Sequence, residues 1–313
     1  MRPGKILLIV VLIIGLGGPS YAAKYAGEFL TLGVGARPIS LGGAYVAESG
    51  DALSGYYNPA GLSALTRPEA FFMHSETFGA LLNHDYLSYA RPLGDSEHRA
   101  ALAISLYRLG GGGIIVTGSR DGRFYQIKEE SHADYAGYFS YGRAFNDKFR
   151  AGVSAKLIYR DIVDENAFGV GLDIGAQASP LRWVDFGLNI QDATTTLLSY
   201  STGRKESIYP TCKIGARFHG QKGRFESVIL GDADVRFEGI DYGAQISAGP
   251  ASIDTHFGLE ISYMGKIAGR IGSEYGNLTL GAGLTLGRFN VDLAMRNHTD
   301  LDNTFLVSLA AGF

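Results

Sequence analysis

The sequence has little cysteine and little net charge, and each shortage excludes a class of protein. Its only cysteine is Cys212, so no disulfide can form within the chain. The formal net charge is −3 and no basic block occurs, so nucleic-acid binding has no electrostatic support. Beyond the N-terminal stretch, no apolar run approaches the roughly 18 residues that a transmembrane helix needs. A disulfide-stapled fold, a nucleic-acid-binding protein and a helical membrane protein are therefore all disfavoured.

The residue patterns of enzymes and metal sites are also missing. None of the seven histidines has a metal-ligand partner at a familiar spacing, and no Gly-x-Ser-x-Gly elbow occurs. His84 and Asp85 are adjacent in an expected strand, so they point to opposite faces and form no dyad. The run Gly110–Gly113 lacks the lysine and helix of a phosphate-binding loop and is interpreted as a flexible external loop. We therefore expect no enzyme, no cofactor and no metal, with an outer-membrane hydrolase as the weakest alternative.

The first residues have the pattern of an export signal. A positive start at Arg2 and Lys5 precedes an apolar run of about 11 residues, Ile6–Leu16. That run fits the core of a signal peptide and is too short to span a bilayer as a helix. Small residues follow at the spacing that signal peptidase needs, so cleavage is expected between Ala22 and Ala23. The sequence thus predicts export through a cleavable signal peptide, with an uncleaved anchor as the alternative.

Glycine and aromatic residues are abundant. The chain has 44 Gly, 18 Tyr and 17 Phe, against 9 Pro. This composition suits many twisted strands with aromatic belts. The mean hydropathy is close to zero, and a membrane barrel has a neutral average because its apolar residues alternate with polar ones.

Apolar and polar residues alternate along much of the chain. Leu278, Leu280 and Leu284 share one parity, and Thr279 and Gly283 share the other. In a strand this gives one apolar face and one face of small or polar residues. Small residues on the second face fit a crowded barrel lumen. The length of the alternating segments is close to the about 9 to 11 residues with which a tilted strand crosses a bilayer. A transmembrane barrel is favoured, and a soluble barrel or sandwich is the alternative.

The alternation predicts about fourteen strands, an even number as in bacterial single-chain barrels. They are expected at residues 69–78, 83–92, 98–108, 133–144, 148–160, 167–178, 184–192, 209–218, 225–236, 255–263, 266–275, 277–286, 288–297 and 304–313. The three longest gaps, 109–132, 193–209 and 237–255, all follow odd-numbered strands, and the gaps after even-numbered strands are tight. Long external loops and short periplasmic turns have this pattern. We predict an all-β, antiparallel transmembrane barrel in the outer membrane of a bacterium with two membranes.

Charged residues of both signs recur at the lumen-facing parity. They are Arg150, Lys156, Asp173, Asp185, Lys213, Arg217, Glu226, Asp232, Asp234, Glu260, Arg270, Glu274, Asp292 and Arg296. Mixed signs in a narrow lumen predict mutual ion pairs that fill the barrel, whereas a ring of one sign would indicate ion selectivity. We expect structural filling, with a selectivity filter as the alternative.

The last strand carries a second candidate signal. Phe305, Val307, Leu309 and Phe313 share the apolar parity, and the chain stops at Phe313. A last strand that ends in Phe resembles the signal that the barrel-assembly machinery reads in outer-membrane proteins. We expect this machinery and the outer-membrane lipid as partners, with an ordinary terminal strand as the alternative.

The segment before the strands differs from the rest. Residues 29–64 are dense in Gly and Ala and lack long alternation; Asp51 could cap a short helix, and Asn58-Pro59 is a turn signal. The run GVGARPISLGGAYVA, followed by YYNPAGL, resembles the N-terminal signature of the PorV/PorQ family of outer-membrane proteins. These proteins are relatives of the FadL fatty-acid transporters.

The resemblance implies a 14-stranded barrel with an N-terminal hatch inside or beneath it. It divides the chain into a signal peptide (1–22), a hatch segment (23–67) and a barrel (68–313). The residues that match the shared elements are Gly33, Gly35, Ala36, Arg37, Gly42, Gly43 and Ala44, followed by Asn58, Pro59, Ala60 and Gly61. From the residues themselves, the glycines would allow close packing against the wall, and Arg37 could pair with an inward carboxylate.

Three functions stay open at this point. FadL relatives move hydrophobic compounds past the hatch, and PorV captures protein substrates of the type IX secretion system. A channel for hydrophobic small molecules and a shuttle for secreted protein cargo are thus both implied by the resemblance. The third reading is a structural barrel without flux.

Overall fold

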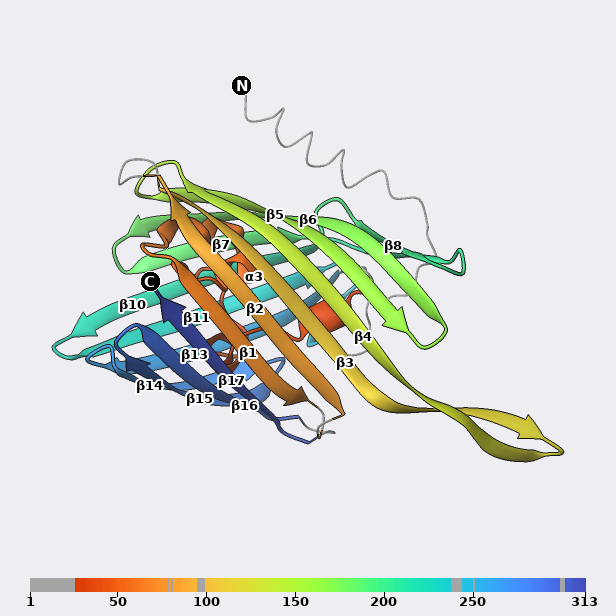
Figure 1. The fold of residues 1–313 in the computed structure, drawn as a ribbon. Helices are drawn as coiled ribbons and strands as arrows, with labels where there is room; N and C mark the ends of the chain where they lie inside the picture. The colour runs from red at the N-terminus through yellow and green to blue at the C-terminus, as the bar shows by residue number, and fades with distance from the viewer. Residues whose placement is uncertain are drawn as a thin grey trace, which may run out of the picture.

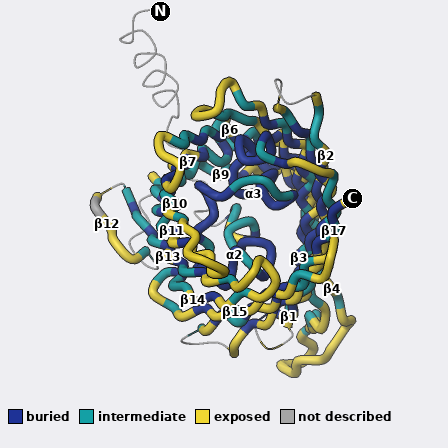
Figure 2. The backbone as a smooth tube through the Cα atoms, turned by 90° about the vertical axis from the view of Figure 1, so that its left-hand side faces the viewer, coloured by how far each residue is buried: buried dark blue, intermediate teal, exposed yellow. Residues whose placement is uncertain are grey.

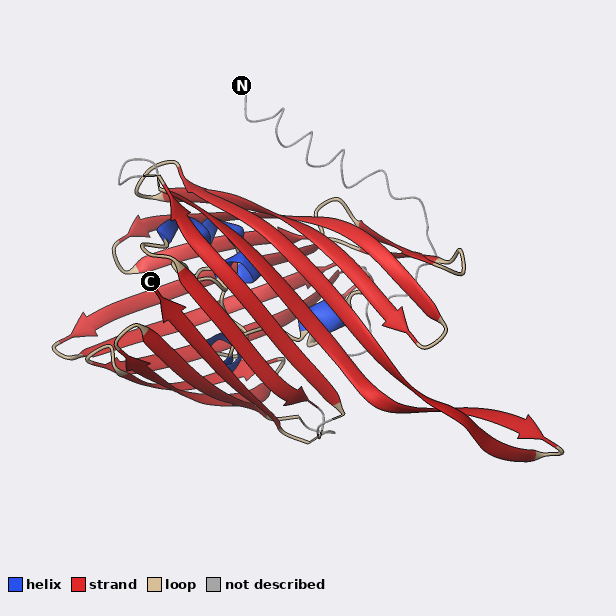
Figure 3. Ribbon diagram, in the orientation of Figure 1, coloured by secondary structure: helices blue, strands red, loops and turns tan. Residues whose placement is uncertain are grey.

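Antiparallel strands that close into a ring make up most of the protein (Figures 1 and 3). The computed structural model describes residues 26–77, 79, 81–94, 99–237, 244–249, 251–298 and 302–313. Fourteen strands of this described chain form the ring, and β1 pairs with β17 to close it. The prediction of an even-stranded antiparallel barrel is confirmed. The signal peptide and its cleavage site between Ala22 and Ala23 lie outside the described residues.

The wall strands follow the predicted order along the chain. They are β1 (Glu69–Thr77), β2 (Leu82–Leu93), β3 (Ala100–Arg120), β4 (Arg123–Ala144), β5 (Phe149–Ile162), β6 (Glu165–Leu181), β7 (Val184–Gln191), β10 (Thr211–Lys222), β11 (Phe225–Arg236), β13 (Ala251–Tyr263), β14 (Ile267–Glu274), β15 (Asn277–Leu286), β16 (Phe289–Arg296) and β17 (Thr304–Gly312). Short strands that were not predicted lie in two of the long gaps: β8 (Thr196–Tyr200), β9 (Lys205–Ile208) and β12 (Ile246–Ala248).

The apolar parity of the wall strands points outward. In β15, Leu278, Leu280 and Leu284 are 43%, 38% and 42% exposed, whereas Thr279 is fully buried. Each large apolar side chain gains about 1.5–3 kcal/mol on leaving water, so a ring of them requires an apolar surrounding. A soluble sandwich would bury these side chains instead. The outward apolar face therefore agrees with a transmembrane barrel and not with the soluble alternative.

At one end of the barrel lie the short turns, the start of the first strand β1 and the end of the last strand β17. We call this end the turn end; the C-terminus lies there, at the left in Figure 1. Exposed aromatic side chains mark this end, among them Phe149, Trp183, Tyr263, Phe289 and Phe313. A girdle of this kind is typical of the boundary between the apolar core of a membrane and water.

The opposite end, which we call the hairpin end, carries a long projection made by β3 and β4 (Figure 1). The two strands stay paired out to Arg120↔Arg123, with a register shift between Gly111 and Ile114. The interpretation of Gly110–Gly113 as a flexible loop is therefore wrong. These glycines lie within β3, because the alternating pattern is broken there by a bulge and not by the end of the strand.

The described chain has four short helices before its first strand. They are η1 (Glu28–Thr31), α2 (Ala36–Ser40), α3 (Ser54–Tyr57) and η2 (Pro59–Ala64). Of these, α2 and α3 can be seen inside the ring of strands (Figure 2). Among the described residues, no helix is long and apolar enough to cross a membrane. α3 begins at Ser54 with Leu53 as its N-cap, so Asp51 is not the cap residue. The Asp51 side chain nevertheless accepts a hydrogen bond from the Ser54 amide at 3.0 Å.

Candidate functional site

Residues 26–67, which we call the plug, fill the lumen between the wall strands (Figure 2). Its apolar residues are fully enclosed: Val34, Ala36, Ile39, Leu41 and Ala44 are each 0% exposed. A short irregular segment can be buried in this way only if the wall satisfies its backbone groups. The contacts below show how the wall does so.

The first seat for the plug is a row of glycines that crosses three strands. Gly142 of β4 lies opposite Gly152 of β5, which in turn lies opposite Gly175 of β6. A Cβ at any of the three would overlap Asn58 or Pro59 of the plug. The row therefore forms a flat patch on the wall where the turn at Asn58-Pro59 packs directly against the sheet.

The second seat lies across the lumen, on β13, β14 and β15. Gly258 and Gly272 are paired in register, and a Cβ at either would overlap Leu41 or Gly42 of the plug. Gly281 faces Ser40 in the same way. Gly42 itself has φ +69° and lies against the carbonyls of the wall, so this position requires glycine for two reasons.

Asn58 connects the plug to the first seat through neutral hydrogen bonds. Its side-chain nitrogen donates to the carbonyls of Val46, Ala176 and Leu188 at 2.8, 3.2 and 3.3 Å. Its side-chain oxygen accepts from the Ala60 amide at 3.2 Å and so caps η2, in which Pro59 takes the first position. This one amide satisfies backbone groups of both plug and wall.

Other neutral side chains extend these contacts, and we call this half of the lumen (β4–β7) the amide side. Gln177 donates to the carbonyls of Val46 and Glu48, and Asn189 donates to the carbonyl of Tyr57 at 2.8 Å. Gln177 and Asn189 are 1% and 0% exposed. These uncharged donors hold the middle of the plug where water does not reach. Two charged donors of β5 bind it further out, Arg150 to the Ser49 hydroxyl at 3.0 Å and Arg160 to the Ala26 carbonyl at 3.3 Å.

Charged groups hold the other half, on β10, β11, β13 and β14, which we call the ionic side. Arg37 reaches both oxygens of Glu260 at 3.0 Å and Glu48 at 3.2 Å, and donates to the Tyr45 hydroxyl at 2.7 Å. The expected pairing of Arg37 with an inward carboxylate is thus observed. Within the plug, burial raises the pKa of Asp51, opposed by the hydrogen bond it accepts from Tyr45.

Two wall residues on the ionic side bind the plug backbone. Asp232 accepts from the amides of Tyr45 and Val46 at 2.6 and 2.8 Å, and the His256 ring lies 2.6 Å from the carbonyl of Gly42. Sequence reasoning placed Asp232 at the lumen-facing parity and gave His256 no role. A signal was present, because both residues share that parity, but only the register places them beside the plug.

The remaining inward charges form ion pairs along the wall, as predicted. The pairs are Arg150–Asp185, Arg217–Asp185, Lys156–Asp173, Lys213–Asp234, Arg270–Glu260, Arg270–Asp292 and Arg296–Glu274. Glu226 differs from the rest, since it is exposed near the turn between β10 and β11. Mutual pairing leaves no ring of one sign among the described residues, which agrees with the expected structural filling of the lumen.

An aromatic cluster packs against the plug on the side of the hairpin end. Tyr56 contacts Tyr57, Tyr86 and Tyr138 with ring centroids 4.9–6.0 Å apart. Phe29 contacts Tyr107 at 6.0 Å. These rings are 0–7% exposed and form a packed aromatic cluster between the plug and the wall.

The wall is interrupted beside this cluster. β7 ends at Gln191 and β8 begins at Thr196; in between, Asp192 and Thr195 have φ of +53° and +56°. A β-branched residue at positive φ is strained. Lys156, which is 2% exposed, holds Asp192 at 2.8 Å. A cavity of about 40 Å³ adjoins this interruption, between η1 and the strands β9 and β10.

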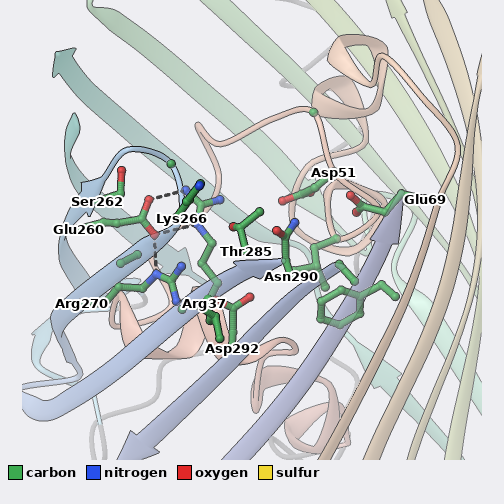
Figure 4. A pocket seen from close by; sticks show the side chains of 18 of the residues that line it. Arg37, Asp51, Glu69, Glu260, Ser262, Lys266, Arg270, Thr285, Asn290 and Asp292 are labelled. Carbon is green, nitrogen blue, oxygen red and sulfur yellow. Dashed lines mark hydrogen bonds and ion pairs between the residues drawn. The ribbon is translucent and has the colours of Figure 1, made fainter. Parts of the chain in front are cut away.

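A larger cavity of about 460 Å³ lies at the turn end, between the plug and β13–β16 (Figure 4). Arg37, Glu260 and Arg270 form a linked group on one wall of it, and Asp51 and Glu69 lie on the opposite wall. The ionic side of the plug therefore borders open space, whereas the amide side does not border this cavity.

The residues of the expected barrel-assembly signal lie on the outer face, as their apolar parity predicts. Phe305, Val307, Leu309 and Phe313 are 64%, 42%, 42% and 62% exposed on the outer face of the last strand and at the end of the chain. Cys212 is half-buried in β10. In the described part of the chain, no group of three or more His, Cys, Asp or Glu could hold a metal ion.

The fold resembles that of solved transport proteins. The toluene transporter TodX of Pseudomonas putida has a TM-score of 0.60 and 13% identity, over 90% of this chain and 98% of that chain. The toluene transporter TbuX of Ralstonia pickettii has a TM-score of 0.59 and 12% identity, with the same coverage. A FadL homologue of Pseudomonas aeruginosa has a TM-score of 0.55 and 10% identity, over 86% and 96%.

The sequence comparisons add nothing to this likeness, since neither a family model nor a curated protein matches the chain. At 10–13% identity the structural likeness shows the fold alone. The protein has a FadL-like barrel fold with its N-terminal segment in the lumen.

Proposed function

We propose that the protein lies in a bacterial outer membrane and lets hydrophobic small molecules cross it, with the plug as the gate. One observation carries the proposal: the lumen is closed by a segment that is seated on glycine rows and held by polar contacts. A general porin would have no use for a lumen filled in this way.

The proposed route passes the aromatic cluster. A hydrophobic molecule that enters at the hairpin end would displace the packed rings of Phe29 and Tyr107 and then reach the small cavity beside the interruption at Asp192–Thr195. Among the described residues, no strand pairs with the second edge of β9, so the wall is weakest there. We infer that the passenger leaves sideways into the membrane at this point. Structures of similar fold are a toluene transporter and a monoaromatic hydrocarbon channel, which supports a small apolar passenger.

The test combines conductance with uptake, using the wild type and the double substitution Asn58→Ala with Pro59→Gly. The double substitution removes the side-chain donor to three carbonyls and the fixed φ of proline, so the plug should loosen. Wild type should show little steady current in planar bilayers, and the variant should show more. Labelled toluene should enter cells that express wild type faster than cells without it. A large, stable wild-type conductance would indicate a general porin, and no gain in uptake would contradict transport.

A second candidate function is the handling of a secreted protein, as the resemblance to PorV implies. The projecting β3–β4 hairpin favours it, because apolar side chains such as Phe124 are 81% exposed beyond the barrel. Pull-down of secreted proteins by wild type and by a variant with a shortened hairpin tests it. Equal recovery with both proteins would contradict it.

Export and assembly complete the proposal. We expect the mature chain to begin at Ala23 and Phe313 to act in recognition by the barrel-assembly machinery. Mass spectrometry of outer-membrane fractions should find the Ala23 terminus, and recovery of the intact chain would contradict cleavage. Deletion of Phe313 should lower the yield of the heat-modifiable folded form in cells; an unchanged yield would leave the last strand as an ordinary one.

A further inference from the structure

We propose that the free edge of β3 in the projecting hairpin (residues 111–132) binds an extended strand of another polypeptide, whose carboxylate lies beside Arg120 and Arg123. The inference concerns a surface outside the lumen and does not depend on transport. It deepens the second candidate function, the handling of a secreted protein. It shares with that function only the assumption that a polypeptide binds at the hairpin end.

Beyond the barrel wall, the outer edges of the hairpin strands β3 and β4 are unpaired in the described parts of the chain. Pairing between β2 and β3 ends at Asn83↔Gly110, and pairing between β4 and β5 ends at His132↔Ile162. Beyond these points, within the described parts of the chain, the outer edges of β3 and β4 pair with no strand. Their outward backbone N–H and C=O groups are a template for an added strand. Water satisfies these groups in the free hairpin, but a polypeptide backbone offers N–H and C=O groups at the matching spacing along the whole edge, which a lipid does not.

The two edges differ in protection, and the difference selects β3. Natural proteins block exposed edges with charges, above all lysine, or with proline. The outer part of β4 carries Lys128, Glu129 and Glu130 opposite Ile114–Val116, and its uncharged run nearer the tip covers only residues 124–127. Ile114–Ser119 of β3 contains no charge and no proline, and begins with three consecutive apolar β-branched residues. Unprotected, uncharged and β-branched, this edge is suited to strand addition.

The tip of the hairpin supplies a second, independent observation. Arg120 and Arg123 lie directly opposite each other as the last pair of the hairpin. Like charges in cross-strand pairs destabilise a hairpin. Neither guanidinium has an ion pair with a carboxylate within the described chain. An incoming carboxylate would relieve the repulsion and form charge-assisted hydrogen bonds. The partner strand is therefore uncharged along β3 and acidic at the end near the tip.

The chain offers a matched pair of test positions. Ile115 of β3 and Ile127 of β4 are 58% and 57% exposed, so replacing either one removes a similar area of exposed apolar surface. A lysine at Ile115 blocks the proposed edge, whereas a lysine at Ile127 lies on the other strand. A difference between Ile115→Lys and Ile127→Lys therefore reports the edge and not general hydrophobicity.

The experiment is a selection of displayed random nine-residue peptides on the full-length protein in nanodiscs. Selected peptides should be rich in β-branched residues and carry Asp or Glu near one end. Synthetic copies should bind Ile115→Lys at least about tenfold more weakly and Ile127→Lys within about twofold of wild type, since cross-strand contacts form only along β3. Binding should also slow amide exchange at Ile114–Ser119. Arg120→Gln combined with Arg123→Gln should abolish the preference for an acidic end.

Three outcomes would overturn the proposal. Selected peptides could bind equally to a variant in which residues 112–131 are replaced by an Asn-Gly turn. The lysine at Ile127 could weaken binding as much as the one at Ile115. Alternatively, the protein could dimerise through the hairpin, with Ile115→Lys restoring the monomer, which would make a second copy the occupant. Failure of cargo pull-down with successful peptide selection would remove the second candidate function and leave this edge intact as a binding surface.

Discussion

The amide side and the ionic side hold the same plug by different physical means. On the amide side, buried neutral groups such as Gln177 and Asn189 donate to plug carbonyls. On the ionic side, Arg37 pairs with Glu260, and its side chain is 24% exposed. Salt screens partly exposed ion pairs, whereas neutral buried hydrogen bonds do not respond to it.

The difference indicates where the plug would open first. The ionic side borders the cavity of about 460 Å³, so water and ions reach its contacts (Figure 4). Glycines seat the plug closely on both sides, but no residue of β4–β7 lines this cavity. We therefore expect the amide side to act as the fixed attachment and the ionic side as the part that releases.

Filling the first glycine seat should have the largest effect. Gly175→Ala places a Cβ onto the Asn58 side-chain oxygen, and the overlap should cost about 1–3 kcal/mol of folding free energy. The cost should lie near the upper end, because the hydrogen-bonded Asn58 amide and the Pro59 ring cannot easily move away. Gly137→Ala in β4 is the control, since a Cβ there meets no atom within 4 Å. Urea unfolding in lipid vesicles measures both variants; equal stabilities would show that the plug is not seated at Gly175.

Loss of the central amide should rank second. Asn58→Asp keeps the oxygen that accepts from Ala60 but directs a carboxylate at three carbonyls that the amide had satisfied. Unsatisfied buried groups of this kind cost about 1–3 kcal/mol. Urea unfolding should show this loss at low and at high salt alike. A loss that disappears in high salt would mean that water reaches the amide side and would remove its contrast with the ionic side.

Removal of the main ionic contact should have a smaller effect. Arg37→Gln leaves Glu260 with Arg270 as a partner, so the unfolding free energy should fall by only about 1 kcal/mol. The difference in unfolding free energy between wild type and Arg37→Gln should shrink in 1 M salt, because salt screens the Arg37–Glu260 pair that only the wild type has. A loss as large as that of Asn58→Asp would contradict the assignment of this side as the weaker attachment.

Salt alone should give the smallest effect, seen as a change in access to the plug. Ser49 lines the cavity at the turn end, so Ser49→Cys in a Cys212→Ala background gives one thiol to label. A water-soluble maleimide should react severalfold faster in 1 M salt than in 0.05 M salt, where the Arg37–Glu260 pair is screened less. A thiol at Gly55, which faces Ser140 on the amide side, is the control and should react slowly at both salt concentrations. Equal salt responses would remove the proposed order of release.

The sequence by itself determined the fourteen wall strands, their order and the face that most of their residues occupy, but it missed β8, β9, β12 and the outer parts of β3 and β4. Side chains alternate with a period of two in any strand, so Leu278 and Thr279 had to point in opposite directions wherever the strand lay. The same rule placed the inward charges and made their mutual pairing predictable. It also failed locally at Gly110–Gly113, where a bulge breaks the period within a continuous strand.

Only the tertiary structure decided which residues meet. The glycines at 142, 152 and 175 are far apart in the chain and form one seat because the register of β4, β5 and β6 aligns them. The register also places Asp232 and His256 against the plug, and it leaves the edge of β3 without a neighbour. Register and strand length are properties of pairs of strands that are set when the ring closes, whereas the alternation is a property of each strand alone.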